Sequence, residues 1–417
     1  MELGQEFTFT PTALVYGGEA LGRLPDGKAV FAPFILPGET GRLRVREEKR
    51  GHVKADLVEI LEPSPQRIPP RCPHFTQCGG CHYQHMPYEM QLVAKAEILR
   101  DQLQRIGGLE EVPLQPIIPS PDAFNYRNHI QFHLDSQGKL GFQAAHSNQV
   151  IPIAACYLPE PALNEIWPRL DFEPLPGLER VSLRLGMDEE IQLILESRDS
   201  ELFEFSVEDL PLSAVHLSPA GAVVLAGSEF VSMEILGRSF QVSAESFFQV
   251  NTRMAEAMVQ HIVRHILEIL PLEPSQTLLD LFCGVGLFSA FLAPRVKKLV
   301  GIEVSSAACR DFAVNLDEFD NVELYEAPVA EVLPQVNFHP DVVLVDPPRS
   351  GLDRPAMDGL LAQAASRMVY VSCDPATLAR DARRLSAAGY RLAQVTPFDL
   401  FPQTYHIESI SLWEKTH

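Results

Sequence analysis

The chain has 417 residues, of which 46% are apolar, and its formal net charge is −21. This length exceeds what one core of ordinary size supports, so we expect two or three domains. The acidic balance argues against a general polyanion binder, the start lacks the pattern of a signal peptide, and no apolar run approaches the roughly 18 residues of a membrane span. We therefore expect a soluble, cytoplasmic and monomeric protein with no membrane partner.

Residues 1–62 read as short strands separated by turn glycines, and Asp26-Gly27 between two apolar runs is a strong hairpin signal. A small OB-like β-barrel of this length is typical of oligonucleotide binding. The segment 42–54 carries six basic residues against two acidic ones, and we expect it to hold RNA backbone. A generic small barrel that binds nothing explains the strand pattern equally well.

Residues 63–239 are expected to form a strand-rich central domain that follows a proline-rich linker. Within it, proline at the first turn and Gly107-Gly108 at the end predict a helix over 87–106. Leu92, Ala96, Leu99, Leu103 and Ile106 give this helix one apolar face, which we expect to pack on the catalytic domain.

From residue 240 to 417 strands alternate with helices, which predicts a doubly wound, Rossmann-like α/β domain. The run 277–293, "TLLDLFCGVGLFSAFLA", is a buried strand, a glycine turn and an apolar helix. The next strand ends at Glu303, where a carboxylate can accept hydrogen bonds from ribose hydroxyls. Asp346 ends a further strand at the same edge. Turn, acid and spacing together favour an S-adenosyl-L-methionine site over an ordinary βα turn with a surface glutamate.

Cys373 follows another predicted strand at this edge and precedes a helix whose N-terminus favours a thiolate. A thiolate that adds to carbon 6 of a uracil ring turns the ring into an enolate, and carbon 5 can then attack a sulfonium methyl. A base must afterwards remove the proton at carbon 5. The last strand offers His406 and Glu408 for that role, although a glutamate on a terminal strand is more often simply solvated.

Three cysteines, Cys72, Cys78 and Cys81, lie within ten residues of one another, and Cys156 follows in the same predicted domain. On spacing alone this set fits either Zn²⁺ or an iron–sulfur cluster. A three-plus-one pattern, with proline after the first cysteine, favours a [4Fe–4S] cluster over the paired cysteines usual at zinc. A structural or RNA-docking role fits better than radical chemistry, because the spacing that leaves an iron open is absent.

Taken together, these motifs resemble those of the RNA uracil-5 methyltransferases, and the resemblance covers nearly the whole chain. The N-terminal strands look like the TRAM barrel of that family. The matching motifs, in the family's order, are "SFFQVN", "LDLFCGVGLF", "IEVS", "DPPRSG", "SCDP" and "HIES".

The resemblance implies that Gln249, Phe282, Glu303 and Asp346 line the cofactor pocket. It also implies that Cys373 is the nucleophile, that Glu408 is the base, and that Cys156 is the fourth cluster ligand. Two positions depart from the family pattern. Asp374 stands where an asparagine is usual, and its carboxylate would raise the pKa of the neighbouring thiol unless it turns away or is paired. Leu287 stands where some members have a polar contact to the cofactor.

We therefore expect transfer of a methyl group from S-adenosyl-L-methionine to carbon 5 of a specific uridine in structured RNA, through a covalent cysteine adduct. Members with four cluster cysteines more often act on large-subunit ribosomal RNA, which favours 23S rRNA, with tRNA as the other substrate. Two alternatives remain. One is an RNA cytosine-5 methyltransferase, which often carries a second cysteine that "DPPR" lacks. The other is a non-catalytic RNA-binding protein that keeps the fold.

Overall fold

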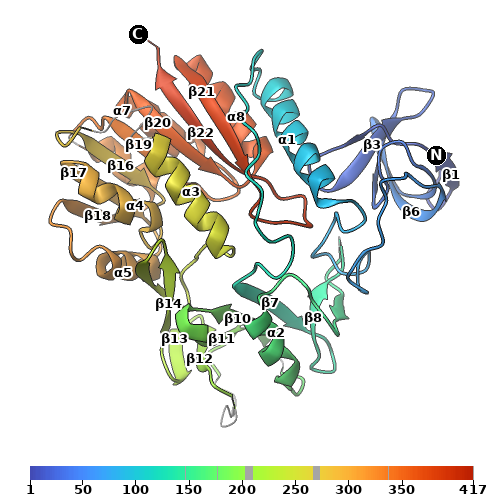
Figure 1. The fold of residues 1–417 in the computed structure, drawn as a ribbon, viewed down its shortest axis with the longest axis horizontal. Helices are drawn as coiled ribbons and strands as arrows, with labels where there is room; N and C mark the ends of the chain where they lie inside the picture. Colours follow the sequence, from blue (N-terminus) through green and yellow to red (C-terminus); the bar gives the residue numbers. More distant parts are fainter. Residues whose placement is uncertain (146, 176, 202–209, 266–272, 337, 417) are drawn as a thin grey trace.

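A seven-stranded sheet forms the C-terminal half of the computed structural model, which describes residues 1–145, 147–175, 177–201, 210–265, 273–336 and 338–416 (Figure 1). Its strand order is β18-β17-β16-β19-β20-β22-β21, and all pairs are parallel except the two that β22 makes. The strands are β16 (Thr277–Leu281), β17 (Lys298–Glu303), β18 (Val322–Glu326), β19 (Val342–Val345), β20 (Arg367–Ser372), β21 (Tyr390–Phe398) and β22 (Glu408–Lys415). The predicted doubly wound domain is therefore present.

Helices cover both faces of this sheet, because successive apolar residues of each strand point to opposite sides. On β16, Leu278 belongs to one core and Leu279 to the other. The first core includes residues of α3 (Thr252–Arg264), α4 (Leu287–Leu292) and α5 (Ser306–Asn315). The second includes residues of α1 (Tyr88–Arg105), α6 (Val329–Val332), α7 (Arg354–Gln363) and α8 (Pro375–Ala387).

The N-terminal strands form a six-stranded sheet in the order β1-β5-β6-β4-β3-β2, around an apolar core of its own. All neighbours are antiparallel except β4 and β6. The strands are β1 (Glu6–Phe9), β2 (Ala13–Leu14), β3 (Glu19–Arg23), β4 (Ala29–Pro33), β5 (Thr40–Glu48) and β6 (His52–Glu62). Gly27 takes the left-handed conformation in the predicted hairpin turn. The strand order shows a sheet, and its closure into a barrel of the TRAM type stays a prediction.

The central part of the chain forms a second seven-stranded sheet in the order β13-β12-β11-β10-β7-β8-β9, against which the short helix α2 (Pro161–Ile166) packs. Only β11 and β12 pair in parallel. The strands are β7 (His129–Leu134), β8 (Leu140–Gln143), β9 (Val150–Pro152), β10 (Leu178–Leu185), β11 (Ile191–Ser197), β12 (Ser213–Ser218) and β13 (Gly221–Ala226). This sheet lies at the bottom of Figure 1, below the other two.

A hairpin of β14 (Phe230–Ile235) and β15 (Arg238–Ser243) connects the central sheet to α3. Its apolar side chains belong to the same core as α3 and α4. The predicted boundary between residues 239 and 240 therefore divides a strand, and the packing moves the start of the catalytic unit to before Phe230. The sequence did not indicate that this hairpin belongs with the catalytic domain, because its apolar face is buried by contacts with helices that follow it in the chain.

Helix α1 joins the parts of the molecule, because it follows the N-terminal sheet in the chain but packs on α8 and β21 (Figure 1). The predicted apolar face is present in part. Leu99 and Leu103 are fully buried, whereas Leu92 is only half-buried. None of the helices that the structure describes combines the length and the apolar character needed to cross a bilayer.

Candidate active site

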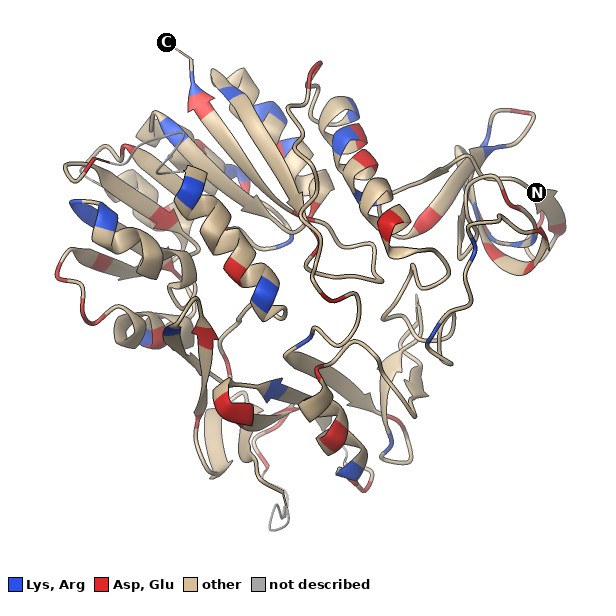
Figure 2. Cartoon of the chain, in the orientation of Figure 1, with Lys and Arg blue, Asp and Glu red and all other residues tan. Residues whose placement is uncertain are grey.

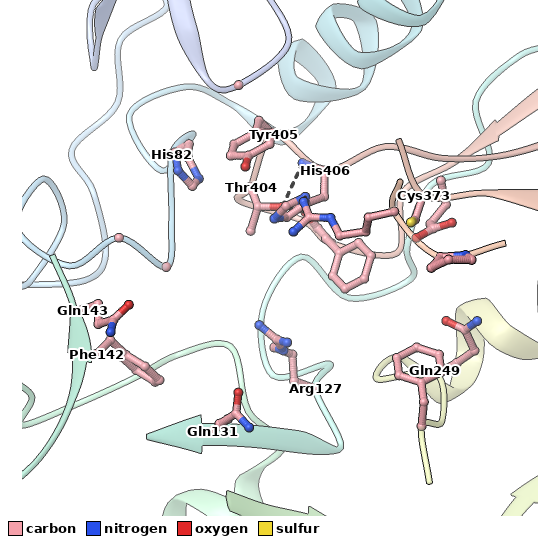
Figure 3. Close-up of a pocket in the computed structure, with 18 of the residues that line it drawn as sticks. His82, Arg127, Gln131, Phe142, Gln143, Gln249, Cys373, Thr404, Tyr405 and His406 are labelled. Atoms are coloured by element: carbon pink, nitrogen blue, oxygen red, sulfur yellow. Dashed lines mark hydrogen bonds between the residues drawn. The ribbon is translucent and has the colours of Figure 1, made fainter. Parts of the chain in front are cut away.

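A cavity of about 1640 Å³ lies where the N-terminal sheet, the central sheet and the ends of the catalytic strands meet (Figure 3). The parallel strands β16, β17 and β19 all end at this edge, which is where open α/β sheets bind ligands. Six residues predicted from sequence line the cavity: Gln249, Phe282, Glu303, Asp346, Cys373 and Glu408. The fold thus brings together side chains that are spread over 160 positions of the chain.

The glycine turn after β16 has the shape that lets a ligand approach the backbone. Phe282, Gly284 and Gly286 have φ values of 62°, 53° and 89°, in the left-handed region. A Cβ atom on Gly286 would lie 2.3 Å from Leu316 Cδ1 and 2.9 Å from Phe312 Cδ2. Glycine at position 286 therefore serves both the turn and the close packing of α5.

Glu303 is fixed at the end of β17 by three backbone donors. Its Oε2 accepts a hydrogen bond from Gly284 N at 3.1 Å, and its Oε1 accepts from Val304 N at 2.7 Å and Ser305 N at 2.8 Å. These bonds join the acid to the glycine turn and leave lone pairs for ligand hydroxyls. This is the geometry expected of a ribose-binding carboxylate.

Two further aspartates surround the same turn, and burial raises the pKa of both Asp280 and Asp346 to about 7. Asp280 Oδ2 accepts a hydrogen bond from Ser289 Oγ at 2.5 Å, while its Oδ1 has no hydrogen-bond partner in the structure. Asp346 lines the cavity, so a cationic ligand bound there would favour the charged form of this carboxyl. The arrangement suits a positively charged cofactor.

Cys373 is half-buried between β20 and Asp374, the N-cap of α8, and its pKa is raised to about 12, mainly by burial and then by the charges of Glu408 and Asp346. Arg349 acts in the opposite direction and lowers the pKa. In the free protein this raised pKa favours the thiol form of Cys373 over the thiolate. The sequence predicted the helix N-terminus and placed both carboxylates in the site, but it did not predict that they would oppose the effect of the helix on the thiol.

Glu408 is buried on the first residue of β22, and burial followed by the charge of Asp346 raises its pKa well above the usual value. His406 lies nearby, but its Nδ1 is bonded to an Arg349 guanidinium nitrogen at 2.8 Å. Burial lowers the pKa of His406 to about 3, so the ring is neutral and accepts this bond. Of the two bases considered from sequence, Glu408 is the one with an electrostatic effect on the cysteine.

Two residues in or beside the site are not among the candidates that the sequence predicted. Phe247 is 71% exposed although it is aromatic, and it lines the cavity beside Gln249. Arg184 is buried and donates to Ser243 O and Ser246 O, both at 2.8 Å, so it holds the chain that leads to Phe247. The "SFFQVN" motif could have pointed to Phe247, whereas Arg184 lies in an acidic stretch that gives no such signal.

The four predicted metal ligands line a second, smaller cavity of about 260 Å³. The pKa of Cys81 is raised to about 12, mainly by burial and in smaller part by the charges of Cys156, Cys78 and Cys72. All four are free thiols, and among the residues described no three His, Cys, Asp or Glu side chains have the geometry of a metal site. The structure therefore shows the four cysteines gathered but does not show the cluster, which stays a prediction.

The basic segment 42–54 is largely neutralised by neighbouring strands. Arg44 pairs with Glu6 at 2.7 Å, Arg42 with Glu59 at 2.8 Å, and Arg46 with Asp56 at 2.9 Å. Lys and Arg are interspersed with Asp and Glu along the chain rather than gathered in one band (Figure 2). The charge count of the segment therefore overstates its attraction for RNA backbone, because the acids come from β1 and β6.

The comparisons with known proteins all identify RNA methyltransferases as relatives of this chain. The family model for tRNA (uracil-5-)-methyltransferases matches residues 219–416. A protein of Aquifex aeolicus described as an uncharacterised RNA methyltransferase is 34% identical over 97% of both chains. A relative from Thermosynechococcus vestitus with the same description is 33% identical over 96% of both.

A solved structure gives the same result for the fold. It is the tRNA (uracil-54, C5)-methyltransferase of Pyrococcus abyssi in complex with S-adenosyl-L-homocysteine. Its TM-score to this chain is 0.71 at 24% sequence identity, and the match covers 98% of this chain and 100% of that one.

Proposed function

The chain belongs to the RNA (uracil-5-)methyltransferase family, and on that premise we propose that it transfers a methyl group from S-adenosyl-L-methionine to carbon 5 of a uridine in structured RNA. The observation that carries this proposal is the convergence of Cys373, Glu408 and Asp346 with the glycine turn in one cavity. A thiol, a late-acting base and a cofactor edge are the three parts that this chemistry requires.

Gln249, Phe282, Glu303 and Asp346 are proposed to hold the cofactor. The cofactor supplies an electrophilic sulfonium methyl group when it is bound. Glu303 accepts hydrogen bonds from the ribose hydroxyls, while the backbone N–H groups that donate to its carboxylate keep it in place. Burial raises the pKa of Asp346 in the free protein, and a cation bound beside this carboxyl would lower the pKa again and favour the charged form.

Cys373 loses its proton to solvent and its sulfur bonds to carbon 6 of the uracil, which breaks the 5,6 π bond and moves that electron pair onto carbon 5 and the carbonyl oxygen at carbon 4, so that carbon 5 becomes nucleophilic. After carbon 5 has taken the methyl group, the Glu408 carboxylate removes the carbon-5 proton. The electron pair of that C–H bond then re-forms the 5,6 double bond and expels the Cys373 thiolate. Glu408 must be ionised at this step, which its burial opposes in the free protein.

The target uridine must leave its base stack so that the Cys373 sulfur can reach carbon 6 of its ring. Phe247 offers an exposed ring on which a base can stack, and Arg127 lies between the catalytic edge and the central sheet (Figure 3). Lys54 and Arg349 add positive charge to the same cavity. These cations support an RNA path through the cavity better than along the paired arginines of β5.

We further propose that Cys72, Cys78, Cys81 and Cys156 bind a [4Fe–4S] cluster. Their common cavity supports this, as does the chemistry of the set: four thiolates gathered in a buried place are costly unless a metal group neutralises them. The resemblance to family members with four cluster cysteines favours large-subunit ribosomal RNA as the substrate, whereas the name of the matching family favours tRNA. The experiment must therefore include both.

The test uses unmodified transcripts of 23S rRNA and tRNA, each incubated with purified protein and methyl-labelled S-adenosyl-L-methionine. Nucleoside mass spectrometry after digestion is expected to show 5-methyluridine in one transcript, and fragment mapping gives the position. A Cys373→Ala variant is expected to give none. Labelled 5-methylcytidine would overturn the assignment of uracil as the target nucleobase. Labelling of RNA by Cys373→Ala would overturn the covalent route.

A further inference from the structure

Tyr16 and Asp374 are separated by 358 positions, yet the Tyr16 hydroxyl donates a hydrogen bond to Asp374 Oδ2 at 2.8 Å. Tyr16 lies in the turn between β2 and β3, and Asp374 directly follows Cys373. The other carboxylate oxygen, Oδ1, accepts from Ala376 N and Thr377 N at 2.9 Å each and thereby caps α8. Both oxygens of this acid are therefore occupied.

The turn that carries Tyr16 is fitted closely against the catalytic part of the molecule. The Tyr16 ring meets the Tyr405 ring edge-on, with centroids 5.4 Å apart. A Cβ atom on Gly18 would lie 2.9 Å from His82 Cδ2, and His82 in turn packs on Tyr405. The hydroxyl of Tyr16 is thus directed by packing on both sides, and tyrosine is half-buried there.

We propose that Tyr16 is a positioning residue for the methyl transfer: by binding Asp374 Oδ2, it holds the carboxylate beside Cys373 in a paired state that tolerates a thiolate. The inference rests on the proposed role of Cys373 as nucleophile. It makes the N-terminal sheet part of the catalytic site, because a hydroxyl from that sheet compensates the aspartate that stands next to the reacting sulfur.

The charges around the two residues agree with this role. Cys373 is faced by Glu408 from β22, by Asp346 after β19 and by the cation of Arg349. Although Asp374 is adjacent in sequence, it raises the pKa of the thiol less than either of the other two acids. Tyr16 is faced by Arg349 and Tyr405 as well as by Asp374.

Loss of the hydroxyl would leave Oδ2 without its donor, and an uncompensated carboxylate disfavours a neighbouring thiolate. The test is the rate at which iodoacetamide alkylates Cys373 in the free protein between pH 7 and 10, followed on the Cys373 peptide by mass spectrometry. Below the pKa of a thiol, this rate is proportional to the thiolate fraction.

Tyr16→Phe is expected to lower the alkylation rate about tenfold at each pH, which equals a rise of about one unit in pKa. Asp374→Asn is expected to raise the rate, because the amide keeps an oxygen for the helix cap and carries no charge. In the Asp374→Asn background, Tyr16→Phe is expected to have no further effect. The turnover of RNA by Tyr16→Phe should fall about tenfold with an unchanged KM for RNA.

The matched control is Thr12→Val, which removes a hydroxyl bond to Leu21 O near the same hairpin. It should leave the alkylation rate unchanged. Equal alkylation of Tyr16→Phe and the native protein, with only a weaker fold or a higher KM for RNA, would overturn the proposal. The proposal would also be overturned if Tyr16→Phe lowered the alkylation rate by the same factor in the Asp374→Asn background as in the native protein. Methylation by Cys373→Ala would refute the covalent function, and the alkylation data would still decide the coupling.

Discussion

Lys95 and Asp399 form an ion pair whose side chains are both completely buried, with 2.6 Å between Lys95 Nζ and Asp399 Oδ1. Lys95 also donates to Phe401 O at 3.0 Å. The pair joins α1 to the segment after β21, which contributes Phe401, Tyr405 and His406 to the cavity. A helix outside the catalytic unit therefore fixes one wall of the site.

Lys95→Met is expected to lower the free energy of unfolding by about 3–5 kcal/mol, because it leaves the Asp399 carboxylate buried without a partner. Urea denaturation followed by circular dichroism measures the change. The double variant Lys95→Met, Asp399→Asn should recover most of the loss, since it buries no charge. If Lys95→Met lowers the free energy of unfolding by less than about 1 kcal/mol, the Lys95–Asp399 pair is accessible to water in solution.

Glu408→Gln is expected to stop the reaction after methyl transfer, because the amide cannot take the carbon-5 proton. Turnover should fall by about 10²–10⁴-fold. A covalent complex of protein and labelled RNA should accumulate and survive denaturing electrophoresis. The same complex must be absent when Cys373→Ala is added. Normal turnover by Glu408→Gln would show that another group acts as the base.

The sequence predicted the catalytic sheet well, because its signals are local. Each parallel strand is a short apolar run followed by a polar residue, so this pattern alone places Glu303, Asp346 and Cys373 at one edge of the sheet. Helix α1 carried caps and an apolar face, and was predicted to within one residue at each end.

What the sequence did not predict depends on contacts between distant segments. The arginines of β5 looked free because their partners Glu6 and Glu59 lie on other strands. Arg184 lies among acidic residues in the sequence, which gives no sign of a buried role, yet the fold directs it inward to two carbonyls. The bond between Tyr16 and Asp374 joins opposite ends of the chain, so no spacing rule can reveal it.

Glu303→Ala is expected to weaken the binding of S-adenosyl-L-homocysteine at least tenfold, because ribose hydroxyls lose a charged acceptor and the glycine turn loses a restraint. Isothermal titration calorimetry measures the change. Glu326→Ala, at the end of the neighbouring strand β18, is the control and should bind normally. Equal affinities of the two variants would remove Glu303 from the cofactor site.

The four cysteines of the smaller cavity are expected to hold about four iron and four labile sulfide per chain in protein purified without oxygen. Cys81→Ser should lose most of this iron, because Cys81 is surrounded by the other three thiols. Cys309→Ser is the control, since Cys309 is buried against the catalytic sheet instead. Zinc in place of iron, or no metal in either protein, would contradict the cluster.

Asp346 makes a prediction about stability and pH in the free protein. Its pKa is raised to about 7 by burial, whereas the ordinary value for aspartate is 3.8. The folded state therefore holds a proton that the unfolded state has lost between about pH 4 and pH 7. The stability that this proton contributes is complete below pH 4, and it is lost as the pH rises through 7.

Asp346→Asn removes this contribution, because the amide does not titrate. Between pH 5 and 6.5, the slope of unfolding free energy against pH should become more positive by up to about 1.4 kcal/mol per pH unit. Urea denaturation of both proteins at several pH values measures the two slopes, and all groups that titrate alike in both proteins cancel in the difference. Parallel curves would mean that Asp346 is ionised throughout this range, and that the free site already stabilises its charge.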